Sequence, residues 1–518
     1  MEEQHPRYGQ EISEEDWERT PTSVKHLVGE LLKRVEQLER QLGELQEQNQ
    51  LLREQNQLLQ ERVKRSSANS SQPPSQDPPQ VGKLSRKAKS GRKRGGQPGH
   101  RGHERHLYPL EACQSITDHY PHVCRCCGAS LRGEDPSPYR HQVVEIPPLN
   151  PQVEEHRLHQ LRCQHCGAKS RAALPQTVAA SGYGARVVAH VGLLSGMYRH
   201  SERMVQSALQ DLFGVVMSLG TVNRLRQEAS AAVASAVEEA HQYVQQQPVV
   251  GADETSFTQA NADGHNPQQQ RAWLWVVVTP LVTFFQVLLS RSQQAAQIVL
   301  GHDFSGILTS DRHSSYNWVE LSQRQLCWAH LKRDFTQIAE RTGVSGELGA
   351  ALLKQQEQLF ELWYRVRDGT LTRHEFITAV ELIRQRVKAL LTEGASYEIG
   401  AREKTPLAKT VRTCQQLLKV EPAMWLFVSI EGVEPTNNAA ERAIRPAVLW
   451  RRTSFGTQSQ AGSIFVARML TVVTTLRSQQ RSVLEYITAA CLAARQAKPA
   501  PSLLPEVANS EDQVLPAA

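Results

Sequence analysis

The stretch that decides the fold is Val249-Val250-Gly251-Ala252-Asp253-Glu254, a short apolar run that stops at two carboxylates. This pattern predicts a buried strand that ends on an acidic residue. Two further strands are predicted at 271–279 and 282–289, which are rich in β-branched and aromatic residues. A helix is predicted at 292–300, and a fourth strand at 306–311 again ends on an acid. The segment is therefore expected to fold as three strands, a helix and a fourth strand.

Two of these strands end on Asp253 and Asp311, and a third acid follows at Glu441. Three strands, a helix and another strand, with acids at strand ends, is the order of a ribonuclease-H-like core. Carboxylates that converge from separate strands and a helix can hold two divalent cations, one activating a nucleophile and one stabilising the leaving oxygen. Mg²⁺ (or Mn²⁺) suits such oxygen ligands. The sequence thus predicts a multidomain α/β protein with an Asp-Asp-Glu metal site.

Each acid also has a structural interpretation. Asp253 and Asp311 could cap the segments that follow them, because aspartate is a favoured helix N-cap. Asn438-Ala439-Ala440-Glu441 matches a capping box, with the glutamate three residues after the cap. Any one acid taken alone would be interpreted as structural, so the metal-site prediction depends on all three.

Length, charge and cysteine content bound the class of protein. A chain of 518 residues is expected to form about three domains. The N-terminus is acidic and has no apolar core, so no signal peptide is predicted. The longest apolar stretch, 273–289, is interrupted by Pro280 and polar residues, which favours a buried hairpin over a membrane helix. Nine cysteines, four of them in two tight pairs, favour metal binding in a reducing cytoplasm, and the net charge of +6 is a mild basic excess.

Residues 24–63 carry a heptad repeat typical of a leucine zipper. Leucine recurs every seven residues, at Leu31, Leu38, Leu45, Leu52 and Leu59. The other core position of the repeat includes Asn49 and Asn56, which favour a parallel dimer in one register. A solitary surface helix is the alternative, but it does not account for five unbroken leucines. We therefore predict dimerisation through this segment.

A polar, proline-rich linker at 66–80 leads into a basic arm. Between Lys83 and Arg105 nine cations face one acid, and five glycines disfavour a helix. Such an arm can lie along DNA phosphates and release counterions without reading bases. The alternative is a solvated tail without a partner. The candidate phosphate contacts are Lys87, Arg92, Lys93, Arg94 and Arg101.

Two Cys-x-x-Cys-Gly knuckles begin at Cys124 and Cys163 and are joined by strand-like sequence at 140–146 and 152–161. Each glycine allows a tight turn that points backbone amides at the thiolates. The spacing predicts a structural Zn²⁺ in a four-thiolate ribbon, and accidental thiol pairs in a core are the alternative. The predicted ligands are Cys124, Cys127, Cys163 and Cys166, while His122, Cys126 and His165 are surplus donors that leave ligand swapping open.

Helical patterns surround the predicted core. Helices at 201–213 and from Ser218 onward, with Arg224 and Arg226 as candidate DNA contacts, resemble a helix-turn-helix. Helical hairpins that only build a core are commoner, so this signal is modest. The run Thr372-Arg373-His374-Glu375 is a capping box that begins a helix within a helical insertion. Arg451 and Arg452 follow the third acid and are further candidate DNA contacts.

These signals predict the order of the domains. They are an N-terminal tail (1–23), a leucine-zipper coiled coil (24–65), a disordered linker and basic arm (66–110), a zinc ribbon (111–175), a helix-turn-helix-like DNA-binding segment (176–245), the first part of the ribonuclease-H-like core (246–330), a helical insertion (331–430), the second part of the core (431–497) and a disordered tail (498–518).

Several motifs together resemble those of the DDE transposases of the insertion sequence 66 family, over nearly the whole chain. Besides the coiled coil and the zinc knuckles they are Arg94-Gly95-Gly96-Gln97-Pro98-Gly99-His100, Ala252-Asp253-Glu254-Thr255, Ser310-Asp311 with Tyr316, Cys327-Trp328-Ala329-His330 and Asn437-Asn438-Ala439-Ala440-Glu441-Arg442-Ala443-Ile444-Arg445-Pro446. The last run is the most specific. The first knuckle departs from the family pattern, because it carries Arg125-Cys126 where a proline is common.

The resemblance implies a ribonuclease-H-like catalytic domain interrupted by a helical insertion, with Asp253, Asp311 and Glu441 as metal ligands. It also implies that Cys327 and His330 support the site without doing chemistry. Elements of this family encode small accessory proteins as well, which are therefore possible partners of the chain.

The function we expect is that of a transposase that binds the ends of its insertion sequence and catalyses Mg²⁺-dependent strand cleavage and strand transfer. It would act on DNA as a homodimer or higher oligomer, in the bacterial cytoplasm at the nucleoid and without a membrane partner. A non-catalytic dimeric DNA-binding regulator is one alternative, and it would need neither the three acids nor Mg²⁺. A ribonuclease-H-like nuclease that only hydrolyses is the other, and it would not need the dimerising and DNA-binding segments.

Overall fold

The computed structural model describes residues 13–63, 66, 69, 106–175 and 178–505. The chain forms two compact units, each built from two separate stretches. The insertion unit comprises Met1–Gly82 and Ser305–Asn438, and the sheet unit comprises Lys83–Phe304 and Ala439–Ala518. Both contain helices and strands, so the chain is a mixed α/β protein with more than one folded unit.

The sheet unit is built on the three strands that the sequence predicts. They are β3 (Val249–Phe257), β4 (Ala272–Val278) and β5 (Thr283–Leu288), antiparallel and in the order β5-β4-β3. Strand β4 is buried along most of its length, as expected for the middle strand of a covered sheet.

Strand β3 continues beyond the two carboxylates at which the sequence predicts its end. Asp253 is the fifth of nine residues in this strand and lies opposite Val276 of β4. The ladder runs on to Phe257, which lies opposite Ala272, because the intervening Thr255 and the aromatic Phe257 suit a pleated strand. The predicted strand end was therefore wrong, and Asp253 projects from the middle of a strand.

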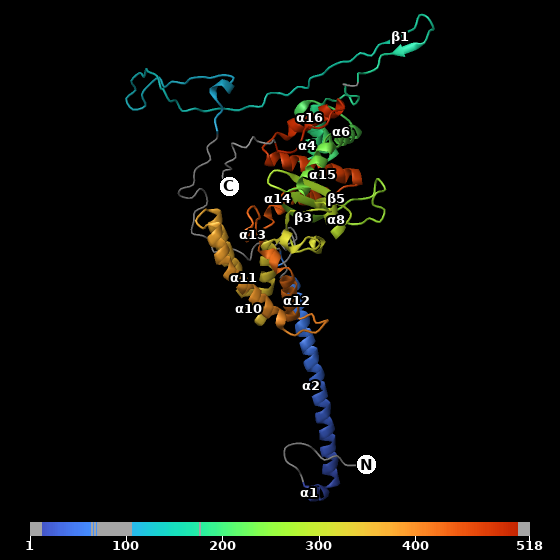
Figure 1. Ribbon diagram of the computed structural model, residues 1–518, viewed down its shortest axis with the longest axis vertical. Helices are drawn as coiled ribbons and strands as arrows, with labels where there is room; N and C mark the ends of the chain where they lie inside the picture. The colour runs from blue at the N-terminus through green and yellow to red at the C-terminus, as the bar shows by residue number, and fades with distance from the viewer. Residues whose placement is uncertain (1–12, 64–65, 67–68, 70–105, 176–177, 506–518) are drawn as a thin grey trace. The chain divides into compact units, whose positions relative to one another are not determined.

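Helices accompany this sheet, as Figure 1 shows for α15, α16 and α4. Helix α15 packs against β5, and α16 packs against α4. Among the residues that the structure describes, no helix has the length and apolarity needed to cross a membrane. The helices are α4 (Ala185–Gly196), α5 (Glu202–Phe213), α6 (Leu219–Ala232), α7 (Ala234–Gln245), α8 (Gln293–Leu300), α15 (Gln460–Ser478), α16 (Val483–Arg495) and α14 (Asn438–Ser454), the last beginning where the insertion unit ends.

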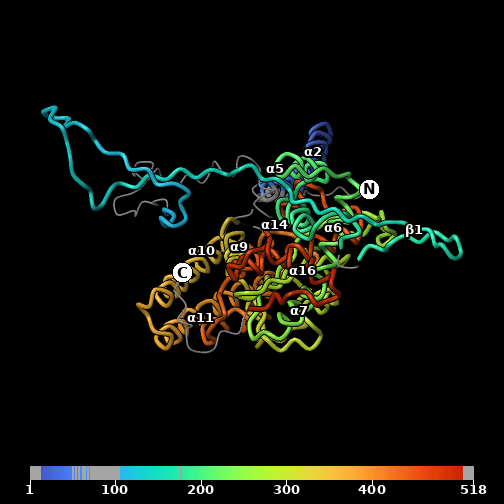
Figure 2. Tube along the Cα trace, turned by 90° about the horizontal axis from the view of Figure 1, so that it is seen from above, coloured from blue at the N-terminus to red at the C-terminus, as the bar shows by residue number. Residues whose placement is uncertain are grey.

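The insertion unit contains a parallel pair of short strands, β6 (Ile307–Ser310) and β7 (Arg324–Leu326). Figure 2 shows α9 and α10, which pack against each other. The capping box predicted for Thr372 and Glu375 is present and begins α11. The helices are α9 (Trp328–Ala339), α10 (Val344–Arg367), α11 (Arg373–Ser396), α12 (Pro406–Lys419) and α13 (Leu426–Ser429), with 3-10 turns η3 (Ser314–Tyr316), η4 (Leu321–Gln323) and η5 (Glu421–Met424).

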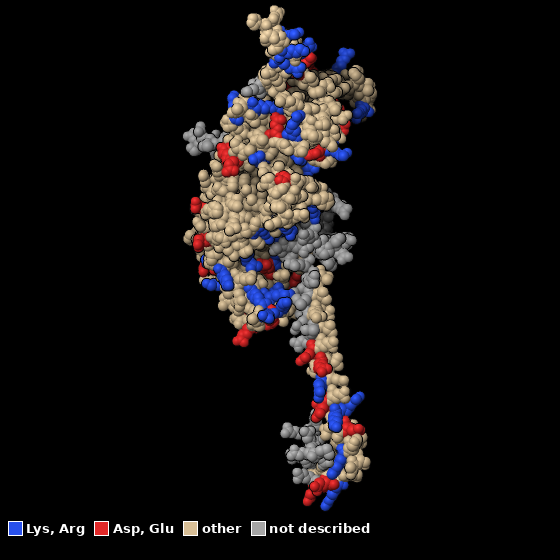
Figure 3. Space-filling model, turned by 90° about the vertical axis from the view of Figure 1, so that its right-hand side faces the viewer, with Lys and Arg blue, Asp and Glu red and all other residues tan. Residues whose placement is uncertain are grey.

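The zipper segment forms one continuous helix, α2 (Thr22–Val63), after the short α1 (Glu14–Glu18). Its predicted contact leucines are 50–56% exposed, and the two asparagines of the repeat are also exposed. Figure 3 shows lysines, arginines and acids interspersed along this helix. The leucines are Leu31, Leu38, Leu45, Leu52 and Leu59, and the asparagines are Asn49 and Asn56.

The segment that carries the cysteine knuckles contains little regular structure. It has a 3-10 turn, η2 (Leu110–Ala112), and a two-stranded antiparallel ladder of β1 (Gln160–Arg162) and β2 (Lys169–Arg171). Of the strands predicted at 140–146 and 152–161, only the last residues of the second are in a strand. The flanking residues are almost all exposed, so their apolar side chains gain little from the pairing that a strand would provide.

The tail predicted to be disordered at 498–518 is partly folded against the sheet unit. The hydroxyl of Tyr486 donates to the carbonyl of Pro501 (2.6 Å), and Gln479 donates to that of Leu503 (2.8 Å). The side chain of Leu503 is fully buried. Burial of Leu503 and the hydrogen bonds to the carbonyls of Pro501 and Leu503 stabilise this segment despite its polar composition. The prediction of disorder was therefore wrong for 498–505. Residues 506–518 lie outside the described residues.

Helix α15 supplies hydrogen-bond partners to β5, the edge strand of the three. The backbone N–H of Thr283 donates to the hydroxyl of Thr475, and that of Phe285 donates to the hydroxyl of Thr471, both over 3.0 Å. Thr475 also donates to the carbonyl of Thr283 (3.1 Å). Two residues along a strand advance about 6.6 Å and four along a helix about 6 Å, so the two spacings match. Both threonine side chains are fully buried.

Replacing Thr471 or Thr475 with valine keeps the side-chain shape but leaves a buried N–H of β5 unpaired. We expect each change to lower the free energy of unfolding by about 1–3 kcal/mol, measured by urea denaturation. The half-buried Thr474 on the same helix provides the control, and Thr474→Val should have a smaller effect. An equal loss in all three variants would show that the hydroxyls do not hold the strand.

Candidate active site and nucleic-acid interface

Asp253 and Glu254 are neighbours on strand β3 but lie in different environments. Successive side chains of a strand point to opposite faces of the sheet. Asp253 is partly exposed, and its Oδ1 accepts the backbone N–H of Glu254 over 2.9 Å. The side chain of Glu254 is completely buried. The two acids therefore cannot play the same part.

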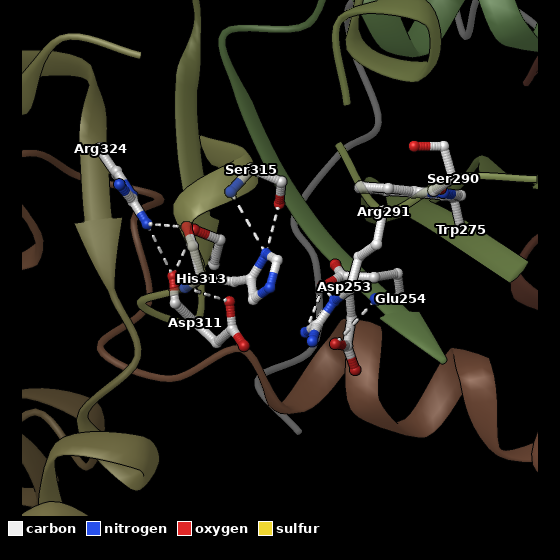
Figure 4. Close-up of polar contacts among 10 residues, drawn as sticks. Asp253, Glu254, Trp275, Ser290, Arg291, Asp311, His313, Ser315 and Arg324 are labelled. Carbon is white, nitrogen blue, oxygen red and sulfur yellow. Dashed lines mark hydrogen bonds and ion pairs between the residues drawn. The ribbon is translucent and has the colours of Figure 1, made fainter. Parts of the chain in front are cut away.

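Glu254 is held by an arginine. The Nε and Nη2 of Arg291 each lie 2.6 Å from Oε1 of Glu254, as Figure 4 shows. The same guanidinium lies 4.8 Å from the ring centroid of Trp273. A buried carboxylate is costly unless it is paired and hydrogen-bonded, and Arg291 provides both. Glu254 is therefore a structural acid that fixes Arg291 beside strand β3.

Asp311 follows the last residue of strand β6 and lies in a tightly bonded loop (Figure 4). Its Oδ1 accepts the backbone N–H of His313 over 2.9 Å. Arg324, which is 1% exposed, donates to the carbonyls of Asp311 (3.0 Å) and His313 (3.2 Å). The Arg324 guanidinium also lies 5.8 Å from the ring centroid of the buried Tyr316. Burial lowers the pKa of Arg324, and the negative charge of Asp311 offsets part of this effect.

Cys327 joins the end of β6 to the segment that precedes the third acid. Its backbone N–H donates to the carbonyl of Ser310 (2.9 Å), and its Sγ accepts the backbone N–H of Asn437 (3.2 Å). The next residue, Trp328, donates its backbone N–H to the carbonyl of Pro435 (2.9 Å). All of these residues belong to the insertion unit. The buried Cys327 thus connects these two backbone segments, and His330 is the third residue of α9, in the first turn of the helix.

Glu441 lies in the first turn of α14 and is partly buried. The other end of this helix is tied to strand β3 through Arg451. One amino group of Arg451 donates to the carbonyl (2.6 Å) and hydroxyl (2.5 Å) of Ser256 and to the hydroxyl of Thr255 (3.2 Å). The helix that carries the third acid is therefore fixed to the strand that carries the first, within the sheet unit.

The structure distributes the three predicted acids over the two units. Asp311 belongs to the insertion unit, whereas Asp253 and Glu441 belong to the sheet unit. Each acid lies on or directly after a regular element, and its neighbouring backbone is fixed by a buried or partly buried arginine or cysteine.

The two helices predicted at 201–213 and from Ser218 onward are present as α5 and α6, and their helix-turn-helix role stays a prediction. Ser201 and Ser218 cap α5 and α6, each accepting a backbone N–H, and Gly214 ends α5 with a φ of 65°, a left-handed conformation that favours glycine. Arg224 is exposed on α6. Arg226 is partly buried, pairs with Glu202 at 3.4 Å and lies over the ring of Phe465. Of the two candidate DNA contacts, Arg226 would have to leave Glu202 and the Phe465 ring to bind DNA, whereas Arg224 is already exposed.

The two cysteine knuckles have the same backbone geometry. In each, the first cysteine donates its N–H to the residue five positions on and accepts one from the glycine, which has a φ of 73° at Gly128 and 74° at Gly167. Backbone N–H groups of Cys127 and then Cys126 lower the pKa of Cys124, and those of Cys166 and then His165 lower the pKa of Cys163. The knuckles thus favour thiolates, the form that binds metal.

The described residues do not bring the four cysteines into one cluster. No three of Cys124, Cys127, Cys163 and Cys166 have their Sγ atoms within 4.8 Å of one another. Four thiolates repel, and such sites assemble around their cation. The structure describes the two knuckles, and the four-thiolate ribbon stays a prediction.

Sequence reasoning missed the arginines that fix the acidic segments. Arg291 lies between the strand predicted at 282–289 and the helix predicted at 292–300, and Arg324 lies between Asp311 and the motif that begins at Cys327, so no role is predicted for either arginine. The acceptors described above for these arginines lie 11 to 37 residues away in the sequence, so no local pattern predicts the contacts. Candidate DNA contacts Lys87, Arg92, Lys93, Arg94 and Arg101 lie outside the described residues.

The fold and the site define a multidomain α/β protein with paired cysteine knuckles, with acids on strand β3 and a further acid directly after strand β6. A model of the Transposase IS66 family matches residues 183–464, which is more than half of the chain. A second model, the zinc-finger binding domain of transposase IS66, matches residues 121–167. The chain therefore belongs to the IS66 family of transposases, and the resemblance seen in the sequence is confirmed. A family of unknown function also matches residues 18–106.

Two proteins of Sinorhizobium fredii are similar to the chain. The uncharacterized protein y4hP is 25% identical over 388 residues, which cover 69% of this chain and 68% of y4hP. The uncharacterized protein y4qI is 26% identical over 265 residues, which cover 46% of each. Membership of a transposase family that has a zinc-finger domain implies that the chain binds DNA.

The different environments of Asp253 and Glu254 predict different outcomes for the same kind of substitution. Glu254→Gln leaves Arg291 without its buried counter-charge, so we expect a loss of about 3–5 kcal/mol in the free energy of unfolding. Asp253→Asn retains an oxygen acceptor for the backbone N–H, so its loss should stay within about 1 kcal/mol. Chemical denaturation of both variants measures this difference. Equal losses would mean that Glu254 has no structural part of its own.

Proposed function

We propose that the chain is a transposase that binds the ends of its insertion sequence and catalyses strand cleavage and strand transfer with Mg²⁺ (or Mn²⁺). Asp253, Asp311 and Glu441 would act as the metal ligands of a ribonuclease-H-like site. The observation that carries this proposal is the match to the transposase family over residues 183–464, a range that contains all three acids. The positions of the acids on β3, after β6 and in the first turn of α14 support it.

Contacts within each unit fix the chain segments that carry or adjoin the three acids. In the insertion unit, Cys327 bonds both to Ser310, the neighbour of Asp311, and to Asn437, four residues before Glu441. In the sheet unit, Arg451 ties the helix of Glu441 to the strand of Asp253. The chain between 311 and 441 leaves and returns through the helical insertion, so a separation of 130 residues in sequence is no obstacle. Cys327 and His330 would then support the site without doing chemistry.

The donor set suits the proposed cations, because Mg²⁺ and Mn²⁺ prefer carboxylate oxygen. Bound there, such ions would supply activation of a water or 3′-hydroxyl nucleophile and stabilisation of the leaving oxygen. Within the protein, Arg324 would fix the loop of Asp311, and Arg291 would fix Glu254, the neighbour of Asp253 on β3. Asp311 and Asp253 would then be oriented before the cations bind. Such preorganisation avoids reorganisation during the reaction.

The same proposal includes a homodimer or higher oligomer. The exposure of Leu38 and the other zipper leucines supports a partner helix, since a stripe of half-exposed leucines at heptad spacing is stabilised by burial in a coiled coil. Asn49 and Asn56 would set a parallel register. Arg224, Arg452 and the basic arm would contact DNA, and small accessory proteins of the same element would be further partners.

We further propose that Cys124, Cys127, Cys163 and Cys166 hold one structural Zn²⁺. The match to the zinc-finger domain over 121–167 covers all four residues. The two knuckles share one backbone geometry, and amides lower the pKa of the first thiol of each. Thiolates in a tetrahedral set suit zinc, and four protein ligands would leave no position for catalysis.

Asp311→Asn tests the proposed catalysis. We expect Mg²⁺-dependent cleavage and joining of DNA that carries the element's ends to fall by at least about 100-fold. The change removes a metal ligand, and the activation free energy should rise because the cation no longer stabilises the charge that develops in the transition state. Binding of the same DNA should remain close to wild type. Asp303→Asn, at an exposed acid eight residues earlier, is the matched control and should keep wild-type cleavage. Cleavage by Asp311→Asn at the wild-type rate would overturn the assignment and favour the non-catalytic regulator.

Metal analysis of the purified chain tests the zinc proposal. We expect about one zinc per chain, lost in Cys127→Ser because three thiolates hold the ion much more weakly. Cys126→Ser, at the neighbouring thiol, should keep the zinc. The reverse pattern, with zinc lost in Cys126→Ser and kept in Cys127→Ser, would show that the ligand set is wrong.

A further inference from the structure

Two arginines of the sheet unit, Arg271 and Arg452, lie close enough to Arg451 to affect its pKa beside strand β3. Burial lowers the pKa of Arg451, and the positive charges of Arg271 and Arg452 lower it further. Arg271 directly precedes β4, while Arg451 and Arg452 lie in the last turn of α14. Like charges gathered in this way repel, so an anion bound among them would be strongly favoured.

The bonds of Arg451 place its guanidinium without using a carboxylate. The hydrogen bonds described above go to a carbonyl and to two hydroxyls, all on Thr255 and Ser256. These neutral acceptors fix the direction of the side chain but do not cancel its charge. Arg451 therefore contributes a positioned positive charge at the end of strand β3.

Trp273 positions Arg271 on the neighbouring strand. The guanidinium of Arg271 lies 5.2 Å from the centroid of the Trp273 ring, and the side chain is exposed. Arg291, anchored by Glu254, lies 4.8 Å from the same ring. Trp273 is opposite Ser256 in the ladder, and Ser256 is the residue that accepts from Arg451. A planar guanidinium held on an aromatic ring loses little entropy on binding a ligand.

We propose that Arg271, Arg451 and Arg452 form a binding site for backbone phosphates of DNA beside strand β3. The proposal rests on the proposed function, which supplies DNA as the polyanion. Guanidinium groups bind phosphate oxygens in pairs and do not depend on base sequence. Four residues of β3 separate Asp253 from Phe257, which lies opposite the residue after Arg271, and this corresponds to about 13 Å. The site therefore binds DNA phosphates about four base steps from Asp253, and it contributes to DNA binding rather than to strand cleavage.

The test uses the full chain and a labelled duplex, without divalent metal, so that only binding is measured. Arg271→Gln removes one exposed charge, and affinity is followed by fluorescence anisotropy between about 0.05 and 0.3 M salt. We expect the slope of log K against log salt to become shallower by about 0.9, and the dissociation constant near 0.15 M to rise about fivefold. Arg271→Lys should keep the slope, because the charge is retained.

Arg477→Gln is the matched control, since it removes an exposed arginine of α15 in the same unit. The inference is overturned if Arg271→Gln and Arg477→Gln change the slope equally, because the effect would then be one of net charge. It is also overturned if Arg271→Gln binds like the wild type. If the wild-type chain binds no DNA, both the proposed function and this inference fail, whereas intact cleavage with an unchanged slope in Arg271→Gln would remove only this inference.

Discussion

Buried and half-buried guanidinium groups hold the backbone around each acidic segment, and the rest of the proposed site depends on this constraint. Arg324 donates hydrogen bonds to the carbonyls of Asp311 and His313. Arg291 forms an ion pair with Glu254, and Arg451 connects α14 to β3 through hydrogen bonds. A guanidinium taken from water must have its hydrogen bonds satisfied, which demands several acceptors at fixed positions. Satisfying each arginine therefore fixes the chain beside the acid.

The contacts of Cys327 bear on how a large insertion could interrupt the proposed catalytic domain. The helices between Asp311 and Glu441 have their own aromatic core, with Trp363 and Phe427 at 5.3 Å between ring centroids. The chain enters and leaves this region beside Cys327, whose backbone and sulfur bond to both ends. A separately packed insertion with adjoining ends leaves the neighbouring elements undisturbed.

Local patterns in the sequence predicted much of the secondary structure and of the capping. The β3–β5 strands, the capping box at Thr372 and the helix end at Phe213 follow from residue types a few positions apart. The end of β3 was misplaced, because pairing with β4 outweighs the polarity of Asp253 and Glu254. The partners of Arg324 and the packing of Leu503 could not be predicted, since they depend on tertiary contacts. The acids were recognised as candidates, but their roles remain proposals.

The central claim is that Asp253, Asp311 and Glu441 hold one shared divalent-metal site. Replacing the metal with ferrous iron and generating hydroxyl radicals at it cuts the backbone next to the bound ion, so mapping the fragments tests convergence directly. We expect cuts near all three residues, and we expect them to disappear from all three segments when excess Mg²⁺ competes for the site. Cuts confined to one of the three segments, or cuts elsewhere in the chain, would contradict it.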